Sequence, residues 1–241
     1  MSRNIAIVSN VNMPEGPLSH FEDEFEQIAS GLLLHEPTWK FTRYRPYLGE
    51  YPQDLNAYDG VVFSGSPSSV NEPEPWISEM LELIRTLHKM KKPMAGICFG
   101  HQAIAKALGG HVGINPDGWS IGAVPVDWKT HSSWMQPAKR DLRLYAIHNE
   151  QVLELPDGAE MTATAQGCPF AGFRIGTHVM TTQHHPEMPK EFVGAVLEWL
   201  KAPLEHGPDV KSLIRADESL KQEVDGALMM GWITQFLSQG K

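Results

Sequence analysis

The chain has 241 residues, of which 41% are hydrophobic and 20% are charged, as is ordinary for a globular protein with a substantial core. Its net charge of −9 argues against the concentrated basic surface that nucleic-acid binding requires. No apolar stretch approaches the ~18–20 residues of a membrane-spanning helix, and nothing near Met1 has the pattern of a secretory leader. We therefore expect a cytoplasmic protein with no membrane or nucleic-acid partner.

The first half of the chain alternates strand-like and helix-like segments. Short runs rich in β-branched residues predict buried strands, and apolar residues at helical spacing predict the helices between them. The predicted strands are 4–11, 39–47, 58–66 and 93–99, and the predicted helices are 20–34, 75–90 and 100–110. This alternation predicts a mostly parallel sheet with helices on both faces.

After residue 110 the pattern changes to short, closely spaced strands, which is typical of a small mixed or antiparallel sheet. These strands are predicted at 121–128, 142–149, 158–166, 170–176 and 178–185, and a helix is predicted at 189–201. We expect residues 1–204 to form one α/β domain and 205–241 to be a helical extension packed on it. The apolar residues that would dock this extension are Leu228, Trp232, Phe236 and Leu237.

One cysteine lies where a predicted parallel strand becomes a helix. Cys98 has Gly96 and Gly100 on either side, and a tight turn that pushes the central side chain outward needs neighbours without Cβ atoms. Helix N-termini favour the thiolate, and ligands of open α/β sheets bind at the carboxyl ends of strands. The pattern predicts a nucleophile, while a buried structural cysteine is the alternative.

A nucleophile needs a base, and the base needs a group that orients it. The segment TTQHHPEM (181–188) offers both, because His185 and Glu187 are two residues apart and leave an extended chain on the same face. His184 is the rival base, but one position along a strand turns its side chain to the opposite face.

Several motifs together resemble the class I glutamine amidotransferases, and in particular the glutaminase domain of GMP synthase. Gly-Ile-Cys-Phe-Gly-His-Gln (96–102) and Gln-His-His-Pro-Glu (183–187) are similar to the two signatures of this family. The segments VVFSGSPSSV (61–70), IHNEQV (147–152) and TATAQGCPFAGFR (162–174) match further family motifs in the same order. The resemblance covers residues 4 to about 200 and implies a flavodoxin-like α/β fold.

Carried over by position, the resemblance implies a catalytic triad, an oxyanion hole and a substrate site, with neither a cofactor nor a metal ion. The triad would be Cys98, His185 and Glu187. The oxyanion hole would be formed by the backbone of Gly65, Ser66 and Phe99. Substrate, either glutamine or a γ-glutamyl compound, would be bound by Gln102, Asn149 and Glu150.

The chain departs from the family pattern at three positions. His184 stands where an aromatic residue usually precedes the catalytic histidine, Ile147 where serine is common, and Glu150 where aspartate is common. The second cysteine, Cys168, matches a structural position of the family.

Three functions remain open at this point. The chain could be a stand-alone hydrolase of glutamine or of γ-glutamyl peptides. It could instead be a subunit that delivers ammonia to a separate synthase, since it contains no nucleotide-binding Gly-rich loop of its own. The third possibility is a non-enzymatic binding or regulatory protein. The oligomeric state is open as well.

Overall fold

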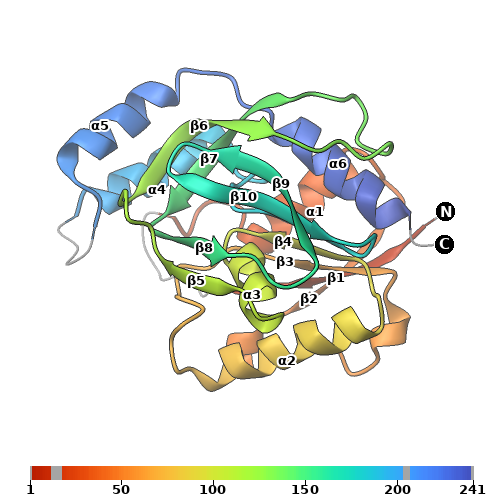
Figure 1. Ribbon diagram of the computed structural model, residues 1–241. Coiled ribbons are helices and arrows are strands. Elements are labelled where there is room, and N and C mark those ends of the chain that lie inside the picture. The colour runs from red at the N-terminus through yellow and green to blue at the C-terminus, as the bar shows by residue number, and fades with distance from the viewer. Residues whose placement is uncertain (1, 12–17, 203–206, 240–241) are drawn as a thin grey trace.

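The computed structural model describes residues 2–11, 18–202 and 207–239, and within them it has a large mixed sheet and a small second sheet (Figure 1). The strands are β1 (Asn4–Val8), β2 (Lys40–Tyr44), β3 (Gly60–Phe63), β4 (Met94–Ile97), β5 (His111–Ile114), β6 (Ser120–Trp128), β7 (Asp141–His148), β8 (Glu150–Glu154), β9 (Ala159–Ala165), β10 (Cys168–Ile175) and β11 (Val179–Thr182). The α-helices are α1 (Glu24–Leu33), α2 (Pro75–Lys89), α3 (Phe99–Ala107), α4 (Lys190–Leu200), α5 (Val210–Ser219) and α6 (Gly226–Ser238), and two short 3-10 helices are η1 (Pro46–Leu48) and η2 (Leu55–Ala57).

The strand order of the large sheet is β2-β1-β3-β4-β11-β10-β9-β6-β7, and its first five strands are parallel. β1, β3, β4 and β11 are buried along nearly their whole length, as strands covered on both faces should be. One core cluster joins α2 and α3 to one face of these strands, and another joins α1 and α6 to the opposite face. The predicted mostly parallel sheet with helices on both faces is confirmed.

The remaining strands extend the same sheet in antiparallel pairs, from β11 through β10, β9 and β6 to β7. The assignment of the predicted strands between 121 and 185 to a separate small sheet was therefore wrong, because they continue the large one. β7 then approaches the chain that follows β11, because Tyr145 forms an antiparallel bridge with His185. The small second sheet is the antiparallel pair β5–β8. Neither of its strands was among the predicted segments, since each is short and mixes polar with apolar residues.

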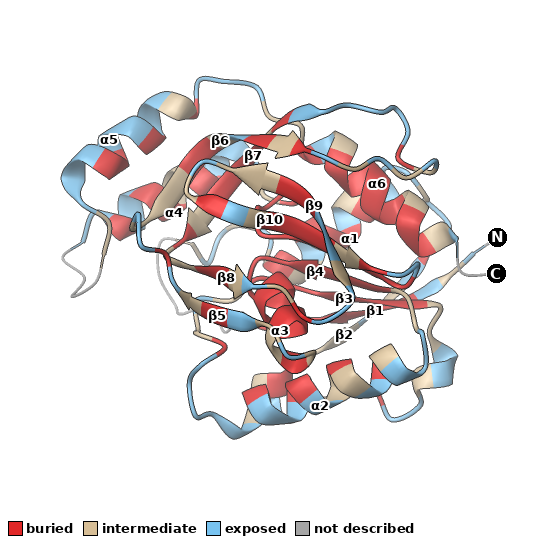
Figure 2. Ribbon diagram, in the orientation of Figure 1, coloured by how far each residue is buried: buried red, intermediate tan, exposed pale blue. Residues whose placement is uncertain are grey.

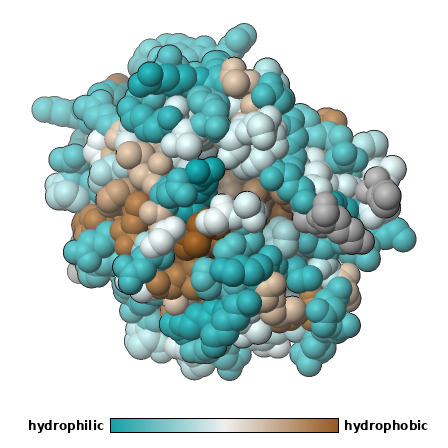
Figure 3. Space-filling view, turned by 45° about the vertical axis from the view of Figure 1, so that its right-hand side comes forward, coloured by the Kyte–Doolittle hydropathy of each residue, from teal (hydrophilic) through white to brown (hydrophobic). Residues whose placement is uncertain are grey.

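Helix α3 is the most deeply enclosed of the helices that lie beside the parallel strands. Figure 2 shows it buried along almost its whole length, whereas α2 and α5 each keep an exposed face. Of its nine residues only Lys106 is not buried. The space-filling view in Figure 3 shows a mostly hydrophilic surface with apolar residues gathered in one region left of centre. Among the described residues, far more large apolar side chains are buried in the core than are exposed.

The C-terminal helices pack on the body of the protein. Trp232, Phe236 and Leu237 of α6 are buried in the same cluster as the α1 face of the sheet, and Leu228 is packed against it. α5 contacts β6, where the Cβ of any residue replacing Gly122 would lie 2.8 Å from Ala216 Cα. Of the predicted extension, residues 205–206 and 240–241 lie outside the described residues.

Candidate active site

Cys98 occupies a sharp turn between β4 and α3. Its φ of +50° is in the left-handed region that side chains other than glycine rarely adopt, so the backbone is strained there. The turn is close-packed: a Cβ on Gly96 would lie 2.7 Å from Gly100 O, and a Cβ on Gly100 would lie 2.3 Å from Phe63 O. The two glycines therefore allow the turn that aims Cys98, as the sequence predicted.

His185 and Glu187 follow β11, next to this turn. His185 Nδ1 lies 2.7 Å from Glu187 Oε1, and both side chains are buried. The backbone N–H of His185 donates to Tyr145 O at 2.8 Å, which fixes the backbone of His185 relative to β7. With Nδ1 bound by the carboxylate, the other ring nitrogen is left for Cys98.

The electrostatics of the site favour a protonated imidazole. Burial lowers the pKa of His185, but the Cys98 side chain and the Glu187 carboxylate raise it by charge and hydrogen bonding, to about 10. An imidazole with a pKa this high carries its proton at neutral pH and can donate it.

The loop after β3 lies against the same imidazole. A Cβ on Gly65 would lie 3.0 Å from His185 Cε1 and 3.8 Å from Cys98 Cβ, so the loop passes directly over the pair. Asn10 holds this loop: its backbone N–H donates to Ser64 Oγ at 2.8 Å, and its carbonyl accepts from Ser66 Oγ at 2.8 Å. Phe99 begins α3, and the first N–H groups of a helix have no partner within it.

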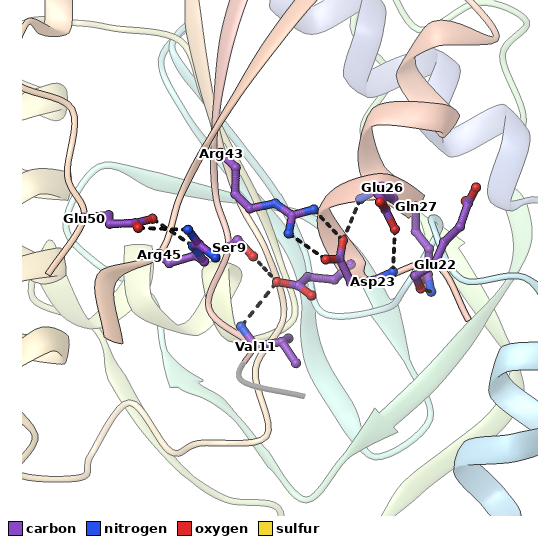
Figure 4. A network of polar contacts seen from close by, with 10 residues as sticks. Ser9, Val11, Glu22, Asp23, Glu26, Gln27, Arg43, Arg45 and Glu50 are labelled. Atoms are coloured by element: carbon purple, nitrogen blue, oxygen red, sulfur yellow. Dashed lines mark hydrogen bonds and ion pairs between the residues drawn. The ribbon is translucent and has the colours of Figure 1, made fainter. Parts of the chain in front are cut away.

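Figure 4 shows the polar network at Ser9 and Val11, the residues on either side of Asn10 in the sequence. The buried carboxylate of Glu24 accepts hydrogen bonds from the Ser9 hydroxyl and from Val11 N–H, so it holds the chain on both sides of Asn10. Burial raises the pKa of Glu24, and the Ser9 hydrogen bond opposes that rise. The segment that holds the loop over the imidazole is thus itself held by polar contacts to Glu24.

The three residues expected to bind substrate have different surroundings. Gln102 is buried, and its Nε2 donates to Glu150 O at 2.9 Å and to Gln183 Oε1 at 3.2 Å. The Glu150 carboxylate accepts from Ser69 Oγ at 2.8 Å, and Asn149 O accepts from Asn115 N at 2.7 Å. Gln102 is therefore tied by its nitrogen, which leaves its oxygen as the atom that can meet a substrate.

His184, the rival base, is fully buried and has quite different surroundings from His185. Its ring lies 5.8 Å from that of His148 in an edge-on arrangement, and neither of its ring nitrogens has a hydrogen-bond partner among the described residues. Burial, followed by the neighbouring histidines His148, His185 and His101, holds its pKa well below the usual value. A neutral ring without an orienting carboxylate is poorly suited to act as the base.

Two residues of the site had no role in the sequence analysis. Asn10 follows β1, and its hydrogen bonds with Ser64 and Ser66 join two loops at the same edge of the sheet. No local sequence pattern predicts that these two loops are neighbours. Gln183 is inside the Gln-His-His-Pro-Glu motif, yet only the structure shows its Nε2 3.6 Å from Cys98 Sγ. The motif was the available signal for Gln183.

Comparison with known proteins identifies the family of the chain. The family model described as glutamine amidotransferase class-I matches residues 39–195, more than half of the chain. The chain belongs to the class I glutamine amidotransferase family. Among its relatives, gamma-glutamyl peptidase 3 of Arabidopsis thaliana is 33% identical over 163 residues, which cover 64% of this chain and 66% of the relative. One subunit of the glutamine-hydrolyzing GMP synthase of Saccharolobus solfataricus is 30% identical over 139 residues, which cover 56% of this chain and 71% of that relative.

A solved structure shows the same fold over the whole length. A glutamine amidotransferase from Thermotoga maritima has a TM-score of 0.79 and 23% identity, covering 98% of this chain and 97% of that one. With the plant peptidases, in contrast, the match spans slightly less than two thirds of their length. The amidotransferase class α/β fold predicted from the sequence is confirmed.

Membrane-spanning and metal-binding features are both absent from the part of the chain that the structure describes. None of the described helices is long and apolar enough to cross a membrane. No group of three or more His, Cys, Asp or Glu side chains among residues 2–11, 18–202 and 207–239 is arranged to hold a metal ion.

Proposed function

We propose that the protein hydrolyses a γ-glutamyl amide bond through a covalent thioester on Cys98, with His185 and Glu187 completing the triad. The observation that carries the proposal is the placement of a strained, glycine-flanked cysteine beside a buried histidine that a carboxylate orients at 2.7 Å. This is the arrangement that covalent acyl transfer needs: a nucleophile, a proton carrier and a group that fixes the carrier.

In the first step Cys98 Sγ attacks the γ-carbonyl carbon of the glutamyl group, and the carbonyl oxygen takes up negative charge. His185 gives its proton to the departing nitrogen, the C–N bond breaks, and ammonia or an amine leaves. In the second step a water molecule gives its proton to His185 and attacks the thioester carbon. The C–S bond then breaks, and glutamate and the thiolate are formed.

Both steps pass through an oxyanion that needs N–H donors at about 2.7–3.1 Å. Phe99 supplies one, as the first residue of α3, and the Gly65–Ser66 loop supplies the facing donor. Support for this assignment comes from the closeness of Gly65 to His185 and Cys98. The Asn10 hydrogen bonds would keep the loop in place while charge develops on the oxygen.

We place the α-amino group of the glutamyl residue near Gln102 Oε1 and the segment of Asn149 and Glu150. The nitrogen of Gln102 is already committed, so only its oxygen can accept a hydrogen bond from an ammonium group. The Glu150 carboxylate adds negative charge to the same region.

For the leaving group, the relatives favour two candidates. Similarity to gamma-glutamyl peptidases favours an amine released from a γ-glutamyl peptide, and this is the substrate class we propose. Similarity to the GMP synthase subunit favours the second candidate, ammonia delivered to a separate synthase.

The test is glutamate release by the purified protein from glutamine and from a γ-glutamyl dipeptide, with Cys98→Ala as control. Cys98-dependent turnover of the dipeptide is the expected result. Little release from either substrate, with Cys98 still labelled by a glutamine-like affinity reagent, would replace the peptidase by the ammonia-supplying subunit. Turnover that survives Cys98→Ala would refute the thioester mechanism.

A further inference from the structure

Gln183 is a buried amide whose side chain ends at the proposed nucleophile. It follows β11 directly, is 0% exposed, and its backbone N–H donates to Ala171 O at 2.8 Å, so its position is fixed by the sheet. Its Nε2 lies 3.6 Å from Cys98 Sγ, within hydrogen-bonding range for sulfur. The proposed mechanism above assigns it no task.

The neighbours of Gln183 determine which end of its amide faces the sulfur. A backbone carbonyl can only accept, so the atom of Gln102 that lies 2.9 Å from Glu150 O must be the nitrogen. The same nitrogen lies 3.2 Å from the Gln183 side chain, and its contact there must be an oxygen. Flipping Gln183 would place two amide nitrogens against each other, so its nitrogen faces Cys98.

From these hydrogen bonds we infer that Gln183 is a further catalytic residue, whose amide N–H donates to Cys98 Sγ and stabilises the thiolate. Gln102 is the positioning residue, because its contact with Gln183 fixes the orientation of that amide. The inference rests on the proposed function, in which the Cys98 thiolate is the attacking group. It gives Gln102 a second task beside substrate binding.

The physical reason is the difference between the two forms of the sulfur. A neutral thiol is a weak acceptor, whereas hydrogen bonds to ionised groups are roughly twice as strong as neutral ones. The buried amide therefore favours the thiolate over the thiol. Gln183 would stabilise the sulfur through the dipole of its amide, and His185 would stabilise it through the positive charge of its imidazolium.

The experiment measures the rate at which iodoacetamide alkylates Cys98 as a function of pH, with peptide mapping to separate Cys98 from Cys168. The full-length protein is compared with Gln183→Leu, the isosteric Gln183→Glu and Gln102→Leu. Gln151→Leu is the matched control, because Gln151 is also a buried amide (1% exposed) but is hydrogen-bonded to Asn115 instead of the sulfur. Urea unfolding of each variant reports its folding.

Gln183→Leu should move the midpoint of the alkylation profile up by about one pH unit, so that alkylation well below both midpoints slows about tenfold. Gln183→Glu should move it further, because a carboxylate would face the thiolate. Gln102→Leu should produce a smaller upward shift, and Gln151→Leu should leave the midpoint in place.

Equal midpoints for wild type and both Gln183 variants would overturn the inference, and so would a shift in Gln151→Leu as large as in Gln183→Leu. If Gln183→Leu does not fold, the uncharged Gln102→Leu decides, because the shift in Gln183→Glu also reflects its added charge. The readout requires no turnover. A protein that releases no glutamate but shows the shifts would count against the proposed peptidase activity and keep the thiolate contact. An active protein without shifts would keep the proposed activity and overturn the contact.

Discussion

Both cysteines are buried, but the groups around their sulfur atoms differ. Cys98 (5% exposed) is at the turn between β4 and α3, with the amide of Gln183 and the imidazole of His185 next to it. Cys168 (1% exposed) begins β10, where burial raises the pKa of its thiol to about 12. Both belong to the same apolar cluster. Burial alone therefore does not distinguish a nucleophilic cysteine from a core cysteine, whereas the polar partners of the sulfur do.

Removing each thiol in turn should give the largest difference between the two cysteines. Cys98→Ala should lower kcat/KM for the γ-glutamyl substrate by roughly 10³-fold or more, because the proposed covalent intermediate forms on its sulfur. Cys168→Ala should leave kcat/KM within about threefold and lower the free energy of unfolding by roughly 1–2 kcal/mol. Steady-state kinetics and urea unfolding measure both effects. Comparable losses of activity in the two variants would remove the distinction.

The next prediction concerns the carboxylate that orients His185. Glu187→Gln keeps the shape but replaces an acceptor that also stabilises the imidazolium, so kcat should fall by about 10²–10⁴-fold. The pKa of His185, now about 10, should fall as well, because Glu187 is one of the groups that raise it. The pH profile of kcat and the NMR titration of His185 check this. Glu198→Gln, on an exposed part of α4, is the control and should retain full activity.

The turn at Cys98 can be compared with an ordinary helix position by two glycine substitutions. Gly100→Ala would put a methyl group 2.3 Å from a backbone oxygen of β3, which must move, and should cost roughly 2–4 kcal/mol of unfolding free energy. Gly194→Ala in α4 meets only Leu220 Cδ1 at 3.8 Å and should be neutral or stabilising by up to about 1 kcal/mol. Chemical denaturation of both variants tests the contrast, and equal stabilities would mean that the turn is not sterically restricted.

Local patterns predicted the parallel strands, the helices beside them and the elbow at Cys98, because each is encoded in a short run of apolar residues or glycines. The ends of strands were less predictable. Residues 9–11 and 64–66 were included in predicted strands, but they form loops that hydrogen-bond each other across the sheet edge. The order of the strands brings these loops together, and it depends on packing of the whole chain.

The same limit applies to the site. Two-residue spacing suffices to place His185 and Glu187 together, and the structure brings Cys98 beside them, although their catalytic roles stay a prediction. Gln183 was not assigned because its contact with Cys98 joins two strand ends that are 85 residues apart. Gln102 was expected to bind substrate, but the sequence did not show that its side-chain nitrogen donates to Glu150 O. That hydrogen bond depends on the position of β8 beside α3.

The smallest predicted effect comes from two adjacent histidines. His185 has charged partners and a raised pKa, whereas His184 has no hydrogen-bond partner for its ring among the described residues and a pKa held well below 6.5 by burial. Replacing His184 by phenylalanine removes a buried polar ring without partners and keeps an aromatic shape. His184→Phe should therefore raise the free energy of unfolding by roughly 1–2 kcal/mol at pH 7.5.

The stabilisation by His184→Phe should increase as the pH falls, because protonation of His184 is linked to unfolding. A histidine whose folded pKa lies below its unfolded value of 6.5 takes up its proton mainly in the unfolded state, so its contribution is complete above pH 6.5 and is lost as pH falls below it. Urea unfolding at pH 7.5 and pH 5 should show a smaller loss for His184→Phe than for wild type. His111→Phe, at an exposed position of β5, is the control for adding a phenyl ring. If wild type and His184→Phe lose the same free energy of unfolding between pH 7.5 and pH 5, His184 must have a proton acceptor in the folded state. The two histidines would then not differ in their protonation as described.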